Sequence, residues 1–207
     1  MHYVALPEDS ALSQAMLKFT RRYAESSGES FTGHLSFDFL VKKEDLHKQA
    51  DEIRLYPIEC NPRAHTAVVL FNQTPKIVEA YMKALEPTFV KWKGSNLNGN
   101  MEKAPIYPVN PQKYYWVGHD LGELVLLPLL HLVQGHASLD QVVANVQTFL
   151  GHLFLWHDGT YEIWDPLPWW WLYHVFWPMK FLDSLKSGRK WSRINVSTTK
   201  MFSVDSD

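Results

Sequence analysis

The spacing of hydrophobic residues predicts a helix and two strands in the first third of the chain. Apolar side chains recur at helical spacing between residues 10 and 28, where Ser10 is a candidate N-cap. Apolar and polar residues then alternate over residues 33–43, as they do in a strand with one buried face. A second strand is predicted over residues 53–61, after a polar connection. We expect these two strands to pair in antiparallel fashion.

A second helix, a long loop and a third helix are predicted next. Thr74 and Pro75 are typical of the cap and first residue of a helix. Residues 91–113 are rich in Gly, Asn and Pro, which indicates a long surface loop of the functional or mobile kind, and we expect the connecting loop to extend over residues 91–118. Residues 119–135 are largely apolar, and they predict a mostly buried helix that is kinked near Pro128.

The last third of the chain predicts a helix that begins after Ser138 and then a hairpin. The hairpin is expected in "HLFLWHDGTYEIWD", where apolar runs flank the Asp158-Gly159 dipeptide that tight primed turns prefer. The pattern as a whole predicts an α+β fold, with an antiparallel sheet and helices packed on one face. We expect one unit over residues 1–90 and another over residues 119–207, with the loop between them.

Composition and charge narrow the class of protein. The chain has 207 residues, of which 46% are hydrophobic and 20% charged, so it can bury a core. The formal net charge is −2 with acids and bases interleaved, which gives no electrostatic footprint for nucleic acid. The single cysteine, Cys60, is expected to be small and buried, and it fits a reducing compartment. A soluble cytoplasmic protein is the default expectation.

The second strand carries an unusual set of polar residues in "LYPIECNPRAHTAVVLF". Because side chains alternate along a strand, Glu59, Asn61 and Arg63 are predicted to share one face. If the two strands pair, Asp38 can lie opposite Glu59. Two adjacent carboxylates repel each other, and a Mg²⁺ ion with its preference for oxygen ligands relieves that repulsion. Arg63 would then meet a phosphate or carboxylate through its planar guanidinium.

The alternative is that these residues are the outward polar side of an ordinary surface strand, where a Glu-x-Asn-x-Arg pattern arises by accident. The flanks of the strand are strongly apolar, however, with "YPI" before it and "AVVLF" after it. A strand between such flanks is not expected to be fully solvated, and buried charges need partners. The context therefore favours the metal and phosphate interpretation.

"GHLSFDFL" followed by "LYPIECNPRAHTA" resembles the C-terminal part of the ATP-grasp fold of carboxylate–amine and carboxylate–thiol ligases and biotin-dependent carboxylases. The resemblance implies that Asp38, Glu59 and Asn61 hold magnesium, with manganese as a substitute, and that all of these with Arg63 bind ATP. It further implies a catalytic role for Arg63 in binding the transferred phosphate or the acyl phosphate.

The same resemblance implies substrate contacts at His65 and Thr66. A narrower resemblance covers "DPLPWWWLYHVFWPMKFLDSLKSGRKWSRINVSTTKMF", which looks like the tail of the ATP-grasp enzymes that make mycosporine-glycine. The implied reaction is an ATP-dependent, Mg²⁺-requiring ligation of an amino acid amine to a phosphate-activated acceptor. The resemblance therefore implies small-molecule substrates.

The parts of an ATP-grasp enzyme that hold the adenine and the first phosphates lie upstream of the acidic strand, and only about 37 residues precede Asp38 here. The sequence therefore predicts that this chain lacks the upstream lobe and has negligible ligase activity alone. A truncated gene product, a fragment that pairs with a partner chain, and a non-catalytic remnant are the three explanations. The remnant would serve as an interaction or peripheral membrane-docking module.

The aromatic segment from Trp169 to Leu182 offers the contact for such a module. It is too short to span a bilayer, which takes a helix of about 20 residues. Its aromatic belt followed by "KSGRK" suits a membrane surface or a partner groove. The simpler interpretation is a helix packed beneath the core. Four histidines of this half lack metal-ligand spacing, and we expect them to be satisfied core or rim residues: His131, His136, His152 and His157.

Overall fold

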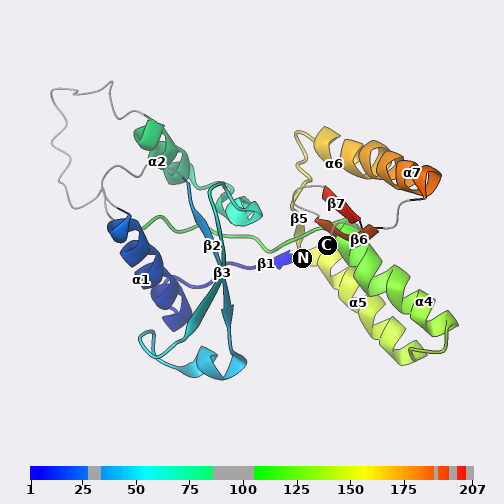
Figure 1. Ribbon diagram of the computed structural model, residues 1–207, viewed down its shortest axis with the longest axis horizontal. Coiled ribbons are helices and arrows are strands. Elements are labelled where there is room, and N and C mark those ends of the chain that lie inside the picture. Colours follow the sequence, from blue (N-terminus) through cyan, green and yellow to red (C-terminus); the bar gives the residue numbers. More distant parts are fainter. Residues whose placement is uncertain (28–33, 86–104, 189–190, 196–199, 204–207) are drawn as a thin grey trace. The chain divides into compact units, whose positions relative to one another are not determined.

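The fold was analysed in a computed structural model, which describes residues 1–27, 34–85, 105–188, 191–195 and 200–203 (Figure 1). The chain divides into two compact units, one of Val4–Pro111 and one that joins Met1–Tyr3 to Gln112–Asp207. The division lies inside the stretch that was predicted to be a loop. Both units mix helices with small sheets, so the chain is of mixed α and β class.

The Val4–Pro111 unit is built on one helix and one strand pair. Helix α1 (Ala11–Ser26) begins after Ser10, whose hydroxyl accepts a hydrogen bond from the Ser13 amide at 3.2 Å. Strand β2 (Ser36–Val41) pairs antiparallel with strand β3 (Leu55–Asn61). The predicted helix, its cap and the predicted strand pair are confirmed.

Aromatic side chains attach α1 to this strand pair. The ring of Phe19 meets those of Phe37 and Phe39 edge to face, with centroids 5.6 and 5.0 Å apart. Ala15 on the same helix and Ile53 before β3 are buried. The alternate residues of β2 that the sequence placed on the apolar face are therefore the ones that contact α1.

Short helices complete the unit. A 3₁₀ helix, η1 (Lys43–His47), lies in the polar connection between the strands, and a second one, η2 (Thr66–Phe71), follows β3. Helix α2 (Pro75–Leu85) begins at the predicted proline. The residue before it, Thr74, is buried, and its hydroxyl accepts a hydrogen bond from the Val109 amide at 2.9 Å.

The second unit is centred on a three-stranded sheet in the order β1-β4-β5. Strand β1 (His2–Tyr3) pairs antiparallel with β4 (Tyr114–Tyr115), and β4 pairs parallel with β5 (His157–Asp158). Both tyrosines of β4 are buried, as is Trp116 directly after them. The core of this unit therefore lies along its central strand.

Most of this unit is helical, and an antiparallel strand pair follows the helical segments. Two of the segments widen into π-helical turns, each followed by a proline in the first turn of the next helix: Pro128 in α4 and Pro178 in α7. The segments are α3 (Val117–Asp120), the π segment η3 (Leu121–Leu126), α4 (Leu127–Val133), α5 (Leu139–Leu155), α6 (Leu167–Trp171), the π segment η4 (Leu172–Phe176), α7 (Trp177–Ser187), and the antiparallel pair β6 (Trp191–Asn195) and β7 (Lys200–Ser203).

Helix α5 begins as predicted. The Ser138 hydroxyl accepts from the Gln141 amide at 3.3 Å, while the Gln141 side chain accepts from the Ser138 amide at 3.0 Å. This reciprocal arrangement is a complete capping box, and it satisfies two amides that the helix itself leaves without partners.

The predicted hairpin around Asp158-Gly159 is wrong. Residues 152–155 form the last turn of α5, and β5 pairs in parallel with β4 rather than with a strand of its own. The turn is closed by the Asp158 carboxylate, which accepts from the Thr160 amide at 2.8 Å. A short apolar run does not distinguish a helix end from a strand, and here the helix continued through it.

Two further expectations for this unit are wrong. The predicted loop of residues 91–118 contains β4 and the first residues of α3 among its described positions. The segment 119–135 is helical, but it is not mostly buried, because Leu126, Leu130 and Val133 are exposed. The apolar composition of this segment led to the expectation of burial, but composition does not show which side of a helix is covered.

Close packing at Gly159 gives a stability prediction. A Cβ atom at this position would lie 2.7 Å from Cε2 of Trp116, and still closer to Cζ2. Because Trp116 is buried and the new methyl group would overlap its ring, Gly159→Ala should lower the free energy of unfolding by about 1–3 kcal/mol. Urea denaturation measures this change. The control is Gly151→Ala in α5, where nothing lies within 4 Å and alanine should stabilise by about 0.5–1 kcal/mol. Equal stabilities of the two variants would contradict this account of the packing.

Candidate functional site

The register of β2 and β3 places the two predicted carboxylates side by side. Asp38 is the direct partner of Glu59, and Ser36 is the partner of Asn61. Directly opposed residues of an antiparallel pair share a face, so these four side chains lie on one side of the ribbon. The intervening pair, Phe37 and Cys60, faces the opposite side.

A β-bulge sets this arrangement. Asp38 pairs with Glu59 while Phe39 pairs with Pro57, so Ile58 is an extra residue on β3. Without the bulge, continued pairing from Pro57 would bring Ile58 rather than Glu59 opposite Asp38. The pairing of Asp38 with Glu59 therefore depends on this bulge, which the alternation of apolar and polar residues in the sequence does not reveal.

His65 lies beside this pair. Its Nε2 is 3.5 Å from Oδ1 of Asp38, and its Nδ1 accepts a hydrogen bond from the Ala67 amide at 3.1 Å. Since Nδ1 accepts, the ring proton of the neutral form is on Nε2, facing the carboxylate. Asp38 is half-buried, Asn61 is buried and Glu59 is exposed.

Arg63 is not on the strand face where it was predicted. Strand β3 ends at Asn61, because Pro62 has no amide to donate to the ladder. The Arg63 carbonyl accepts from the Ser36 hydroxyl at 2.6 Å, which holds this backbone against β2. The exposed guanidinium donates to the carbonyl of its neighbour Ala64 at 3.3 Å.

The remaining predictions for this unit have different outcomes. Thr66 is the first residue of η2, next to His65. Cys60 is exposed, so the expectation that it is buried is wrong. A cleft of about 550 Å³ lies on the α1 side, with Phe19, Arg22 and Leu55 in its lining, and none of the predicted site residues lines it.

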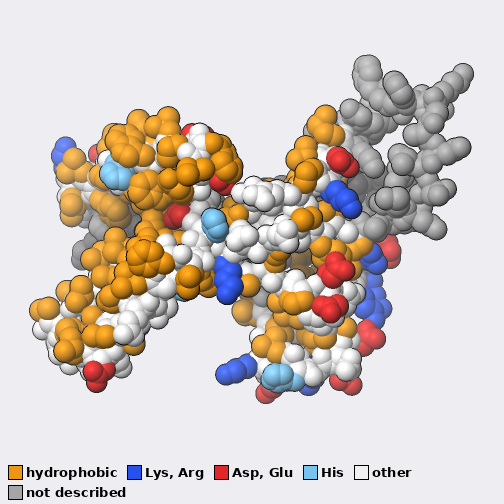
Figure 2. All heavy atoms as spheres, turned by 180° about the vertical axis from the view of Figure 1, so that it is seen from behind, with side chains coloured by type: hydrophobic (Ala, Val, Ile, Leu, Met, Phe, Trp, Pro, Cys, Tyr) orange, Lys and Arg blue, Asp and Glu red, His pale blue; other side chains and the backbone are white. Residues whose placement is uncertain are grey.

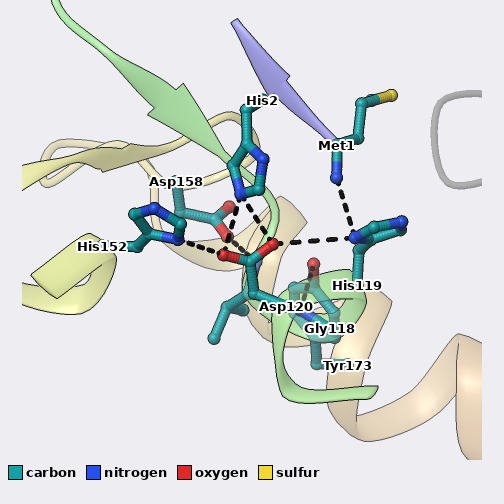
Figure 3. A network of polar contacts seen from close by, with 9 residues as sticks. Met1, His2, Gly118, His119, Asp120, His152, Asp158 and Tyr173 are labelled. Atoms are coloured by element: carbon teal, nitrogen blue, oxygen red, sulfur yellow. Dashed lines mark hydrogen bonds and ion pairs between the residues drawn. The ribbon is translucent and has the colours of Figure 1, made fainter. Parts of the chain in front are cut away.

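A second group of polar side chains lies in the other unit, where the sequence predicted no metal site (Figure 3). His2, Asp120 and His152 each offer a ligand atom, and these atoms lie within 4.8 Å of one another. Nε2 of His2 is 3.0 Å from both carboxylate oxygens of Asp120, and Nδ1 of His152 is 2.6 Å from Oδ2. Among the described residues, no other group of three His, Cys, Asp or Glu side chains brings its ligand atoms this close together.

Local structure holds Asp120 in place at the end of α3. Its amide donates to the Trp116 carbonyl at 3.0 Å, and the amide of Val117 donates to the carboxylate of Asp158 at 2.8 Å. Gly118 follows, and its amide donates to the Tyr173 hydroxyl at 3.3 Å (Figure 3). The short helix is therefore fixed at its first turn.

The three side chains differ in exposure, and burial and hydrogen bonding act in opposite directions on the pKa of Asp120. The side chain of Asp120 is 1% exposed, that of His152 15% and that of His2 38%. Burial by itself would raise the pKa of Asp120, but hydrogen bonds from His2 and His152 outweigh it and hold the pKa below its usual value. Burial, with Asp158 and Asp120 nearby, raises the pKa of the Tyr115 hydroxyl to about 12.

Sequence reasoning missed this group. His152 was expected to be a satisfied core or rim histidine; it is half-buried and hydrogen-bonded, but its partners were not foreseen. His2 and Asp120 were not singled out. The three positions are separated by 118 and 32 residues, and no local spacing connects them. Only the pairing of β1 with β4 and the packing of α5 bring them together.

Comparison of the chain with family models, curated proteins and solved structures finds no match of any of the three kinds.

The opposed carboxylates of β2 and β3 give a prediction about stability. Like charges directly opposite each other in a strand pair are destabilising, so without divalent cations Glu59→Gln should raise the free energy of unfolding by about 0.5 kcal/mol. Urea denaturation in EDTA at low salt measures this change. Glu79→Gln on an exposed position of α2 is the control, and it should change the stability little. A destabilised Glu59→Gln variant would show that the two carboxylates do not repel.

Proposed function

We propose that the end of the β2–β3 ribbon is the magnesium- and phosphate-binding site of an ATP-grasp ligase. The proposed reaction joins the amine of an amino acid to an acceptor that has been activated by phosphate from ATP. Asp38, Glu59 and Asn61 supply oxygen ligands, and Arg63 supplies the positive charge for the phosphate. The acceptor class is proposed from the resemblance of the C-terminal segment to the enzymes that form mycosporine-glycine.

One observation carries this proposal, namely that Asp38 is paired directly with Glu59. Two carboxylates on one face repel each other unless a cation lies between them, and ordinary folds avoid such pairs. Carboxylate and amide oxygens are the ligands that Mg²⁺ prefers, with the rest of its octahedral shell filled by water and phosphate. A magnesium ion bound there would neutralise phosphate charge during transfer.

The neighbouring residues suit the same chemistry. Arg63 is exposed directly after β3, so its guanidinium is accessible to a phosphate in solution. Within the described residues its guanidinium donates to the neutral carbonyl of Ala64, which a charged phosphate group would outcompete. His65 faces Asp38 with its Nε2–H, and it positions that carboxylate. Thr66 offers a hydroxyl next to it for a substrate contact.

The ion site is tested with Mn²⁺, whose free form is counted by electron paramagnetic resonance. The wild-type chain should bind Mn²⁺ and release it to excess Mg²⁺. Glu59→Gln should weaken Mn²⁺ binding by at least about tenfold, because one charged ligand is lost. Glu79→Gln should bind Mn²⁺ as the wild type does. Equal binding by Glu59→Gln and the wild type would refute the proposed site.

The phosphate role is tested with Mg·ATP in isothermal titration calorimetry. Arg63→Ala should weaken binding about tenfold, the worth of one charge-assisted contact. Arg21→Ala on the exposed side of α1 is the matched control, since it removes the same charge elsewhere in the unit.

A second candidate function, a peripheral membrane-docking module, is supported by the aromatic face of α6, η4 and α7. One side of this segment is turned inward, with Trp177 buried and Tyr173 half-buried. The other side is exposed, with Trp170 and Trp171 at 47% and 55%. Figure 2 shows hydrophobic side chains gathered over the helices of this unit. None of the helices in the described residues is long and apolar enough to cross a membrane.

Liposome flotation tests this alternative. If the exposed tryptophans enter the interface of phosphatidylcholine–phosphatidylserine vesicles, the wild-type chain should float with them, and the double variant Trp170→Ser and Trp171→Ser should lose most of that flotation. Leu139→Ser, an exposed apolar position at the start of α5, is the control. A wild-type chain that stays at the bottom of the gradient rules the docking function out.

A further inference from the structure

We propose that His2, Asp120 and His152 form a binding site for a divalent transition-metal ion of the Zn²⁺ class. This site is separate from the proposed magnesium site, because its three residues belong to the unit of Met1–Tyr3 and Gln112–Asp207, while Asp38 and Glu59 belong to Val4–Pro111.

The ligand atoms converge from three different elements. His2 is on β1, where it pairs with Tyr115 of β4. Asp120 ends α3, and His152 is on the last turns of α5. Figure 3 shows both rings turned toward the one carboxylate. A site built by strand pairing and helix packing is held more rigidly than one on loops.

The distances suit one small ion. Around a tetrahedral Zn²⁺, bonds of about 2.0–2.2 Å place neighbouring ligand atoms about 3.3–3.6 Å apart. The observed distances from the Asp120 carboxylate are 3.0 Å to Nε2 of His2 and 2.6 Å to Nδ1 of His152. These two separations would have to open by less than about 1 Å to reach that spacing, and the ligand atoms of all three residues already lie within 4.8 Å of one another. Small rotations of the side chains provide this.

Burial makes the charge of the group important. Asp120 is 1% exposed, and a buried carboxylate needs a positive partner or several hydrogen bonds. With neutral rings, the two histidines supply hydrogen bonds but no charge, and the Met1 ammonium is hydrogen-bonded to His119 rather than to Asp120. A dication supplies the charge, and both nitrogens then act as ligands rather than donors. Two imidazoles and one carboxylate are a common protein ligand set for such ions.

The surroundings resemble those of a metal centre. The ring of Trp156 packs against His2 and His152, with centroids 5.4 and 4.6 Å away, and Tyr115 packs against His152 at 6.1 Å. Such aromatic walls limit water access and fix the ring orientations. His119 extends the group, with its Nδ1 3.6 Å from Oδ1 of Asp120.

The ligand types decide which ion binds. Nitrogen ligands suit Zn²⁺ and its first-row neighbours, whereas Mg²⁺ takes oxygen ligands almost exclusively. Three protein ligands leave one position of a four-coordinate ion for water, which is the arrangement of catalytic rather than structural zinc. The half-exposed side chain of His2 places the group within reach of solvent.

The test uses the full chain without a histidine tag, freed of metal with EDTA and then titrated with ZnCl₂ against a chromophoric chelator. The wild type should bind one Zn²⁺ per chain, and Co²⁺ in its place should give the visible absorption of a four-coordinate site. His2→Ala should weaken Zn²⁺ binding by at least about a hundredfold, beyond the 10–100-fold that loss of an outer-shell partner costs.

The controls separate metal binding from folding. His131→Ala, an exposed histidine on α4, and Asp140→Asn, an exposed aspartate on α5, should bind Zn²⁺ as the wild type does. Asp120→Asn should lose Zn²⁺ binding. Because this substitution also removes a buried charge, its Zn²⁺ affinity is compared with that of the wild type only if the two circular dichroism spectra in EDTA agree. His2→Ala keeps the test decisive, because its side chain is half-exposed and the β1 backbone pairing is unchanged.

The two proposed ion sites must also behave independently. Glu59→Gln should retain full Zn²⁺ affinity, and excess Mg²⁺ should not displace Zn²⁺. A wild-type chain that binds no Zn²⁺, or a His2→Ala variant that binds it as tightly as the wild type, would overturn the proposal and leave a hydrogen-bonded cluster. Failure of the Mn²⁺ experiment on Glu59 bears only on the β2–β3 site.

Discussion

The buried carboxylate of Asp120 constrains the whole unit around it. A carboxylate that is 1% exposed needs hydrogen-bond partners, and the two rings that supply them come from β1 and α5. His2 and His152 therefore join the first residues of the chain to a helix far along it. Loss of either ring would leave part of a buried charge without a partner, which costs more than the hydrogen bond itself contributes.

The two polar groups of the chain differ in the chemistry that their atoms allow. The β2–β3 ribbon brings oxygen atoms together on a half-exposed surface, which suits a hydrated Mg²⁺ and a phosphate. The His2–Asp120–His152 group brings nitrogen atoms to a buried carboxylate between aromatic rings, which suits a softer ion. Because the two groups differ in ligand atoms and burial, they should prefer different metal ions, and the two proposals can be tested separately.

Much of the Val4–Pro111 unit could be predicted because its signals are local. Ser10 caps α1, Pro75 opens α2, and the alternation of Phe37 and Phe39 marks the face that α1 covers. The pairing of Asp38 with Glu59 was also predicted, but its register depends on a bulge at Ile58 that no composition rule reveals. Arg63 was predicted to share the face of Glu59 and Asn61, but it lies beyond the end of β3, because Pro62 has no amide to continue the ladder.

The sequence by itself determined where α1, α2 and α5 begin and which residues of β2 and β3 alternate between two faces, because these features depend on residues a few positions apart. Only the tertiary structure decided the rest. It paired His157–Asp158 in parallel with Tyr114–Tyr115 instead of in a hairpin, and it brought His2 to Asp120 across 118 residues. Contacts between residues so far apart in the sequence arise from strand pairing and from burial of distant segments, and the local hydrophobic periodicity does not predict them.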